Sequence, residues 1–324
     1  MKINKKLTVL SVFAMLAVGV LTTSFTGAQN NTGGSGLLIS PTRTEISGQP
    51  GEKKTFSITV KNVTNGNVKA QAFVNDFESD GSTGTPKIIV DETKEKTPYS
   101  IKSMITGLED VDLKAGETKE VKFGIDIPVN VAPGAYFGAV RYAAVPEGQA
   151  ANTGKEQVAL TASVAHLVFV EVPGTVVQKA QITNVVIKSK DGKNSSIFKA
   201  PQSVETSVKN LGNGFSRPFG KMTITKGKTN VFTDDINNTN PKGIVLPNST
   251  RTFSNAVKGV KSPGKYTVSS GVAYGNGGEV VNFQKSFWYL PIWFVITILL
   301  VLAIVIVGAW MMYKKASGGK AKRK

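Results

Sequence analysis

Apolar and polar residues alternate along most of the chain, which is the pattern of β-strands that bury one face. Phe56, Ile58 and Val60, for example, alternate with polar residues at 57, 59 and 61. Turn residues, chiefly Pro-Gly and Asn-Gly pairs, separate the alternating segments. The pattern predicts strands over residues 37–46, 56–61, 68–74, 101–108, 121–127, 135–145, 158–172, 182–187, 203–209, 221–225, 250–257, 266–274 and 280–287.

No segment between the two ends of the chain sustains helical periodicity. About seven strands in each stretch of roughly 110–140 residues is typical of an immunoglobulin-type β-sandwich. The 324 residues are enough for two such domains. We therefore predict an all-β fold of two tandem immunoglobulin-like β-sandwich domains plus one C-terminal transmembrane helix.

Short segments recur in the same order in both halves of the chain. The pairs are 59–66 with 207–214, 114–118 with 246–250, and 133–136 with 263–266. The first pair shares Val-Lys-Asn and ends in Asn-Gly, and the last shares Pro-Gly-x-Tyr. Common turn residues also match by chance, but the kept order favours the duplication of one β-rich domain.

The N-terminus has the features of an export signal. Three lysines precede an apolar run over 7–21, and small residues at 26–28 stand before Gln29. This predicts a signal peptide over 1–28. The alternative is a retained membrane anchor, for which the apolar run is short. The polar, glycine-rich residues that follow predict a flexible leader over 29–36.

The C-terminus predicts a membrane-spanning helix over 288–313. No charged residue lies between Lys285 and Lys314, and the segment is long enough for a hydrocarbon core of about 30 Å. Aromatic residues stand at both margins, and six basic residues follow within 314–324. By the positive-inside rule this tail is cytoplasmic. The chain is then a single-pass type I protein of the cell membrane, with most of its length extracytoplasmic.

Charge divides the predicted exterior into two unlike domains. The first, over 37–172, together with its leader carries 14 basic and 17 acidic residues, a net charge of −3. The second, over 173–287, carries 16 basic and 5 acidic residues, a net charge of +11. A basic, membrane-proximal domain can attract anionic lipids, anionic wall polymers or an acidic partner. The alternative is a solvated lysine-rich surface. We expect no nucleic-acid partner, since no recognition motif is present.

The sequence offers little catalytic chemistry. The absence of cysteine excludes disulfides, thiol nucleophiles and thiolate metal sites. The single histidine, His166, lies in an alternating strand segment, where packing is the more common role than acid–base catalysis. We find no zincin, phosphate-loop or nucleophile-elbow motif. We therefore expect no enzyme, no catalytic residue and no cofactor.

One acidic cluster resembles the start of a calcium loop. Asp76, Glu78 and Asp80 have the alternating spacing of such a loop and precede Gly81. Lys87 stands where a closing bidentate glutamate belongs, however, so the ligand set is incomplete. We expect a solvated hairpin loop over 75–86 and no metal site, with calcium binding near these three carboxylates as the open alternative.

The chain resembles a known family, the WxL-interacting proteins of the Gram-positive cell surface. The resemblance rests on three segments: Pro50-Gly51-Glu52 before a strand ending at Asn62, the polar loop 75–81, and the segment 133–138 before a closing hairpin. The resemblance implies a signal peptide, a peptidoglycan-binding domain, a host-protein-binding domain, and a transmembrane helix with a basic tail.

These features predict a non-catalytic, membrane-anchored surface protein of bacterial type that acts in adhesion or scaffolding. Its expected partners are cell-wall peptidoglycan or an anionic wall polymer, a surface protein, or both. The alternative is a chaperone-like accessory subunit of a membrane or envelope complex, for which exposed strand edges would serve. The oligomeric state and the contact residues leave no signature in the sequence.

Overall fold

The computed structural model describes residues 36–91, 96–146, 163–275 and 278–318. The predicted signal peptide, most of the leader and the last residues of the basic tail lie outside this range. The strands are β1 (Leu37–Ser40), β2 (Arg43–Ser47), β3 (Lys53–Asn62), β4 (Val68–Asn75), β5 (Phe77–Ser79), β6 (Pro86–Ile88), β7 (Ile105–Thr106), β8 (Val111–Leu113), β9 (Thr118–Asp126), β10 (Gly134–Pro146), β11 (Ser163–Val172), β12 (Ala180–Ser189), β13 (Pro201–Asn210), β14 (Phe219–Lys226), β15 (Thr229–Ile236), β16 (Thr250–Ala256), β17 (Gly264–Tyr274) and β18 (Glu279–Tyr289).

The expected all-β fold with one C-terminal helix is confirmed. Strands β1 to β11 form an N-terminal sandwich of two main sheets, with the orders β1-β3-β9-β7 and β2-β11-β10-β4-β8. Side chains from both sheets meet in one core, which includes Ile58, Phe123, Tyr142 and Val168. The alternation seen in the sequence therefore places every second side chain between the sheets.

The segment predicted as one strand over 37–46 is two strands in different sheets. β1 pairs antiparallel with β3, whereas β2 pairs parallel with β11. The chain crosses between the sheets at Pro41 and Thr42, and Pro41 can donate no backbone hydrogen bond to either ladder. The short strand β1 thus forms one edge of its sheet, as expected for a strand that ends at proline.

Strands β12 to β18 form a C-terminal sandwich. Its sheets have the orders β12-β13-β16 and β15-β14-β17-β18, and its own core includes Val204, Met222, Tyr266 and Val268. The pattern predicted six of its seven strands. It missed the edge strand β15, whose adjacent Asp234 and Asp235 interrupt the expected alternation of apolar residues.

The repeated Val-Lys-Asn segments make the same contacts in both sandwiches. Each asparagine is buried and its side-chain Nδ2 donates to the carbonyl four residues ahead, Asn62 to Gly66 (2.7 Å) and Asn210 to Gly214 (2.8 Å). Each Oδ1 also accepts from the backbone N–H two residues ahead. The shared triplet therefore specifies one kind of turn, held by one asparagine.

The repeated Pro-Gly-x-Tyr segments also have matching roles. The Tyr136 hydroxyl donates to the carbonyl of Ala132 (3.0 Å), and the Tyr266 hydroxyl donates to that of Ser262 (2.7 Å). A tyrosine that bonds backbone a few residues upstream is the tyrosine corner of immunoglobulin-type sandwiches. Both segments thus begin a long strand that enters a closing hairpin, β10–β11 in one sandwich and β17–β18 in the other.

A third apolar cluster lies on the outer face of the β11-β10 sheet. Phe137 and Phe169 point away from the N-terminal core and contact Phe215 of the C-terminal sandwich, with ring centroids 6.2 and 5.5 Å apart. Glu45 pairs with Arg217 (2.5 Å) at the same junction. The hairpin β5–β6 also reaches the C-terminal sandwich, since Ser82 accepts from the Thr252 N–H (2.6 Å).

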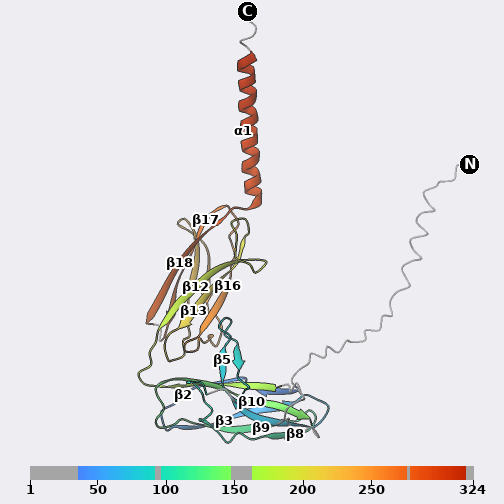
Figure 1. Cartoon of the computed structure of the whole chain (residues 1–324), viewed down its shortest axis with the longest axis vertical. Helices are drawn as coiled ribbons and strands as arrows, with labels where there is room; N and C mark the ends of the chain where they lie inside the picture. The colour runs from blue at the N-terminus through green and yellow to red at the C-terminus, as the bar shows by residue number, and fades with distance from the viewer. Residues whose placement is uncertain (1–35, 92–95, 147–162, 276–277, 319–324) are drawn as a thin grey trace, which may run out of the picture. The chain divides into compact units, whose positions relative to one another are not determined.

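The helix α1 (Ile292–Gly318) follows β18 after a short break at Leu290 and Pro291 (Figure 1). Residues 292–317 are long and apolar enough to cross a membrane. The predicted start at 288 was wrong, because Trp288 and Tyr289 extend the ladder of β18 beside Lys265 and Gly264. The helix then begins directly after Pro291, a residue favoured at helix starts.

Candidate functional site

The outer face of the sheet β15-β14-β17-β18 is polar along its centre. On β14 and β17 the buried residues Met222, Ile224, Val268 and Val272 alternate with residues that point outward. Because neighbouring strands are paired in register, the outward residues form rows across the sheet.

Neighbouring strands place these outward residues side by side. One row contains Asp235, Lys221, Gly271 and Asn282, and the next contains Thr233, Thr223, Ser269 and Gln284. Beyond a bulge in β15, a third row contains Asn230, Thr225, Thr267 and Ser286. We call these twelve residues the polar face.

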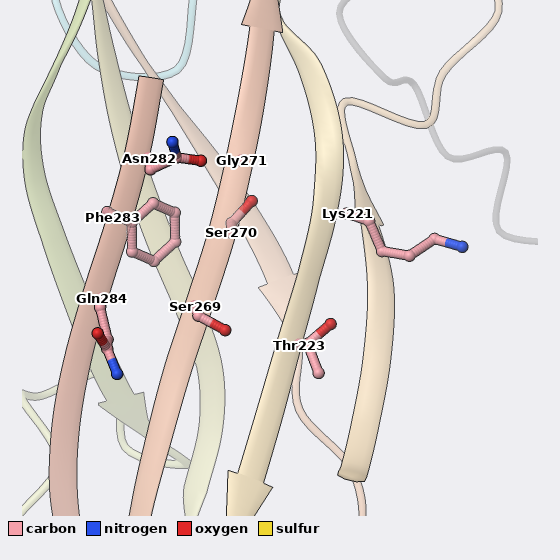
Figure 2. Close-up of a pocket in the computed structure, with 8 residues that line it drawn as sticks. All are labelled: Lys221, Thr223, Ser269, Ser270, Gly271, Asn282, Phe283 and Gln284. Carbon is pink, nitrogen blue, oxygen red and sulfur yellow. The ribbon is translucent and has the colours of Figure 1, made fainter. Parts of the chain in front are cut away.

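A shallow hollow of about 600 Å³ lies on the polar face. Figure 2 shows its residues on β14, β17 and β18, with the Lys221 side chain extending away from Asn282. Gly271 stands between these two in the row and leaves the hollow open. A Cβ at that position would lie 2.9 Å from Asn282 Oδ1 and 3.1 Å from Val280 Cγ1.

The chemistry of the hollow is that of hydrogen bonding. Threonine and serine hydroxyls and two amides supply donors and acceptors, and Lys221 adds one positive charge. Hydrogen bonds to a charged group are stronger than those between neutral groups, so Lys221 favours a ligand with an acidic or strongly accepting group. The hollow is open and wide, which suits part of an extended polymer or a protein surface better than an enclosed small molecule.

Exposed apolar side chains mark both ends of the polar face. Phe219 (40% exposed) and Val280 (54%) lie at one end, and Trp288 (54%) lies at the other. Val280 and Trp288 are both on β18, about 27 Å apart at the usual rise per residue of a strand. Such side chains can stack on the apolar faces of a polar ligand that hydrogen-bonds between them.

His166 is placed as the sequence predicted, packed on one face of β11. It is fully buried, its Nδ1 lies 2.7 Å from the Pro41 carbonyl oxygen, and its ring lies edge-on to Phe123. Burial lowers the pKa of His166, and the hydrogen bond to Pro41 opposes that shift. The imidazole therefore fixes the crossing between β1 and β2 and has no opening to a substrate.

The acidic loop uses its carboxylates in separate contacts. Asp76 is buried and accepts from the Ser100 hydroxyl (2.6 Å), whereas Glu78 pairs with Lys87 (3.3 Å) across the β5–β6 hairpin. Asp80 accepts hydrogen bonds from the Thr83 hydroxyl and from backbone N–H groups within the loop, and these bonds hold the pKa of Asp80 well below its usual range. Within the described residues, no three His, Cys, Asp or Glu side chains are grouped to hold a metal.

No residue of the polar face was predicted from the sequence as a binding residue. The signal was present, since polar residues stand at every second position of 221–225, 267–269 and 282–286. Outward polar residues are, however, the expected default for a solvated sheet face. Only the register, which places three such strands side by side, reveals the hollow.

No family model matches the chain, and no curated protein matches it. Among solved structures, the class 5 fimbriae chaperone CfaA is 12% identical with a TM-score of 0.37, over 79% of this chain and 100% of the other. The Pseudomonas aeruginosa chaperone CupB2 is 12% identical with a TM-score of 0.34, over 76% and 99%. The CsuC–CsuE chaperone–tip subunit complex of Acinetobacter baumannii gives 14% identity and a TM-score of 0.34, over 76% and 97%. The resemblance to WxL-interacting proteins stays a prediction.

Proposed function

We propose that the protein is a non-catalytic, membrane-anchored binding protein whose polar face engages a polymer of the cell envelope. The observation that carries the proposal is the open hollow of hydroxyl and amide side chains around Gly271. A cell-wall polymer offers many hydroxyl, amide and acidic groups along an extended chain. The net charge of +11 over 173–287 favours an anionic polymer.

The position of the polar face in the chain supports an envelope role. β18 contributes Asn282, Gln284 and Ser286 to the face, and the helix α1 begins three residues after β18 ends. The helix is long and apolar enough to cross a membrane, and it would then anchor the face to that membrane. Orientation with the sandwiches outside the cell rests on the predicted signal peptide and the basic tail.

We also propose that the two sandwiches are immunoglobulin-like copies of one duplicated domain. The matching asparagine turns and tyrosine corners support this, because they occur at two of the three pairs of repeated segments. The copies then share a fold and differ in charge, with −3 over 29–172 against +11 over 173–287. The difference in charge is consistent with different partners.

Sedimentation with purified cell-wall sacculi tests the function. The full chain in detergent micelles should co-sediment with sacculi, and the Asn282→Ala/Gln284→Ala variant should bind several-fold more weakly. Gln181→Ala/Gln202→Ala is the matched control, since both glutamines are exposed on the other sheet of the same sandwich. Equal binding by both variants would reject the polar face as the binding surface. Co-sedimentation with sacculi stripped of their anionic polymers distinguishes the two ligands: binding is lost if the ligand is the anionic polymer and remains if it is peptidoglycan.

A chaperone-like accessory subunit is the second candidate function, and the edge of β11 favours it. β10 pairs with β11 from Ser163 to Val172, but β2 pairs on the other side only from Leu167 to Glu171. In the described part of the chain, no strand pairs with Ser163–His166 on that side. An added strand from a partner protein can complete such an edge.

Crosslinking in the native membrane distinguishes the two functions. A photoreactive residue at Ser163 should capture one fixed protein partner if β11 receives a strand. The same residue at Gln284 should capture wall material if the polar face binds polymer. Capture of a protein at both positions would favour a surface protein as the partner of the polar face.

A further inference from the structure

The loop between β12 and β13 carries two neighbouring apolar side chains that contact water. Ile197 is 45% exposed and Phe198 is 48% exposed. Lysines surround them in sequence, at 188, 190, 193 and 199, with Asp191 as the only acid. Adjacent exposed apolar residues in a basic loop are the composition of a membrane-surface contact.

A hydrogen bond fixes this loop beside the start of α1. The Leu290 N–H donates to the Ile197 carbonyl oxygen (2.6 Å), and α1 begins two residues later, at Ile292. The loop is also held to its own sheet, because the Ser195 N–H donates to the Ile187 carbonyl (2.7 Å). Ile197 and Phe198 therefore lie next to the residues where the apolar helix begins.

Two tryptophans beside the start of the helix indicate that this region lies at a membrane interface. Trp288 and Trp293 are 54% and 59% exposed on either side of Leu290. Tryptophans at the ends of a span lie among lipid headgroups. Trp288 and Ile197 also line a common hollow of about 440 Å³, together with Lys285. The loop, the two tryptophans and the start of the span thus lie together, joined by the hydrogen bond between Leu290 and Ile197.

We propose that Ile197 and Phe198 insert into the interfacial region of an anionic lipid bilayer, so that the C-terminal sandwich has a second contact with the membrane beside its helix. The occupant is lipid because Ile197 and Phe198 lie beside the start of the apolar helix and because the flanking lysines complement anionic headgroups. Lys199 is held by Asp191 (2.6 Å), whereas Lys190 and Lys193 are exposed and form no ion pair among the described residues. The inference rests on the proposed anchoring by α1, and it implies that the sandwich is held in one orientation on the membrane.

The absence of cysteine allows a direct test by site-specific labelling. The full chain is reconstituted in vesicles of phosphatidylglycerol and phosphatidylcholine in equal parts, with an environment-sensitive fluorophore on a single introduced cysteine. Phe198→Cys reports the loop. Val280→Cys is the matched control, being an exposed apolar residue at the opposite end of β18, and Ile304→Cys reports the middle of α1.

The fluorescence emission of the label at 198 should be blue-shifted and should be quenched by lipids that carry a quencher near the headgroup. The emission of the label at 280 should remain that of a fluorophore in water. A water-like label at 198 with a deeply quenched label at 304 overturns the inference and leaves the anchoring intact. A label at 304 that is not quenched by lipids carrying the quencher near the end of the acyl chain overturns the anchoring itself. In vesicles of phosphatidylcholine alone, quenching at 198 should weaken, and undiminished quenching would overturn the preference for anionic lipid.

Discussion

At the scale of single residues, buried polar side chains in the two cores are of two kinds. Asn62 and Asn210 satisfy both amide atoms with backbone partners, and each holds a turn. Thr206 and Ser270 are buried with hydroxyl oxygens that have no hydrogen-bond partner among the described residues. A satisfied group specifies structure, whereas an unpaired one costs free energy of folding.

Thr206→Val should therefore stabilise the protein. Thr206 is fully buried on β13 between the inward residues Val204 and Val208, and valine has nearly its shape without the hydroxyl. We expect the free energy of unfolding to rise by about 1–2 kcal/mol. Thermal unfolding of the full chain in micelles measures it. The control is Thr183→Val, which should give no gain because the Thr183 hydroxyl donates to the Ser207 carbonyl (3.3 Å). A lower melting temperature for Thr206→Val would contradict the argument.

His166 should make stability depend on pH. Burial lowers its pKa in the folded protein below the usual value of about 6.5, so the folded state binds fewer protons than the unfolded state. The contribution of neutral His166 to the free energy of unfolding is thus complete above about pH 6.5. It is lost as the pH falls, at up to ~1.4 kcal/mol per pH unit. Unfolding of wild type and His166→Gln between about pH 8 and pH 5 measures the difference. The stability of the variant relative to wild type should improve toward acid pH, and a constant difference would exclude this role.

At the scale of elements, prediction succeeded where alternation was long and failed where it was short. β17 and β18 were predicted from sustained alternation ending in a Gly-rich turn. The strand predicted over 101–108 is a turn, closed by the Met104 N–H on the Ile101 carbonyl (2.8 Å), and only Ile105–Thr106 pair as a strand. Ile101 and Met104 are both buried, and their spacing of three residues fits a turn, whereas residues buried on one face of a strand stand two apart.

The hollow of the polar face could not be predicted in the same way, because it depends on the register of three strands. Gly271 is the decisive residue, because a side chain at this position would fill the hollow beside Asn282. In sequence it reads as a glycine that weakens a strand, although such glycines often mark the close approach of a ligand.

Gly271→Ala tests that role at the scale of the sheet. The added Cβ would push the flexible end of Asn282, so we expect little loss of stability. Wall-polymer binding should fall about fivefold, the size of one hydrogen bond of ~1 kcal/mol. Co-sedimentation measures binding and thermal unfolding checks the fold. Gly278→Ala is the control, since nothing lies near a Cβ there. Unchanged binding by a folded Gly271→Ala would remove the hollow from the function.

At the scale of the whole molecule, the junction of the sandwiches has a signature in the sequence, although no junction was predicted. In 135–145 apolar residues occupy both alternating sets, and not one set alone. A sheet that is apolar on both faces is buried on both. One set, with Val140 and Tyr142, fills the N-terminal core, and the other, with Phe137 and Ala139, lies in the cluster at the junction. The partner, Phe215, follows the asparagine turn of the C-terminal sandwich and could not be identified without the fold.

Phe215→Ala should uncouple the two sandwiches. Phe215 is 4% exposed, and its ring lies between those of Phe137 and Phe169, so its removal leaves a cavity at the junction and not within either core. Replacing a buried phenylalanine with alanine typically lowers the free energy of unfolding by about 3–5 kcal/mol. In calorimetry of the full chain we expect the sandwich transitions to separate, with the one of lower stability shifted down. Phe219→Ala, which removes a ring that is 40% exposed, should leave the transitions unchanged. If Phe215→Ala unfolds as wild type does, the sandwiches fold independently and the junction contributes no stability, so only the linker after β11 would join the N-terminal sandwich to the anchored one.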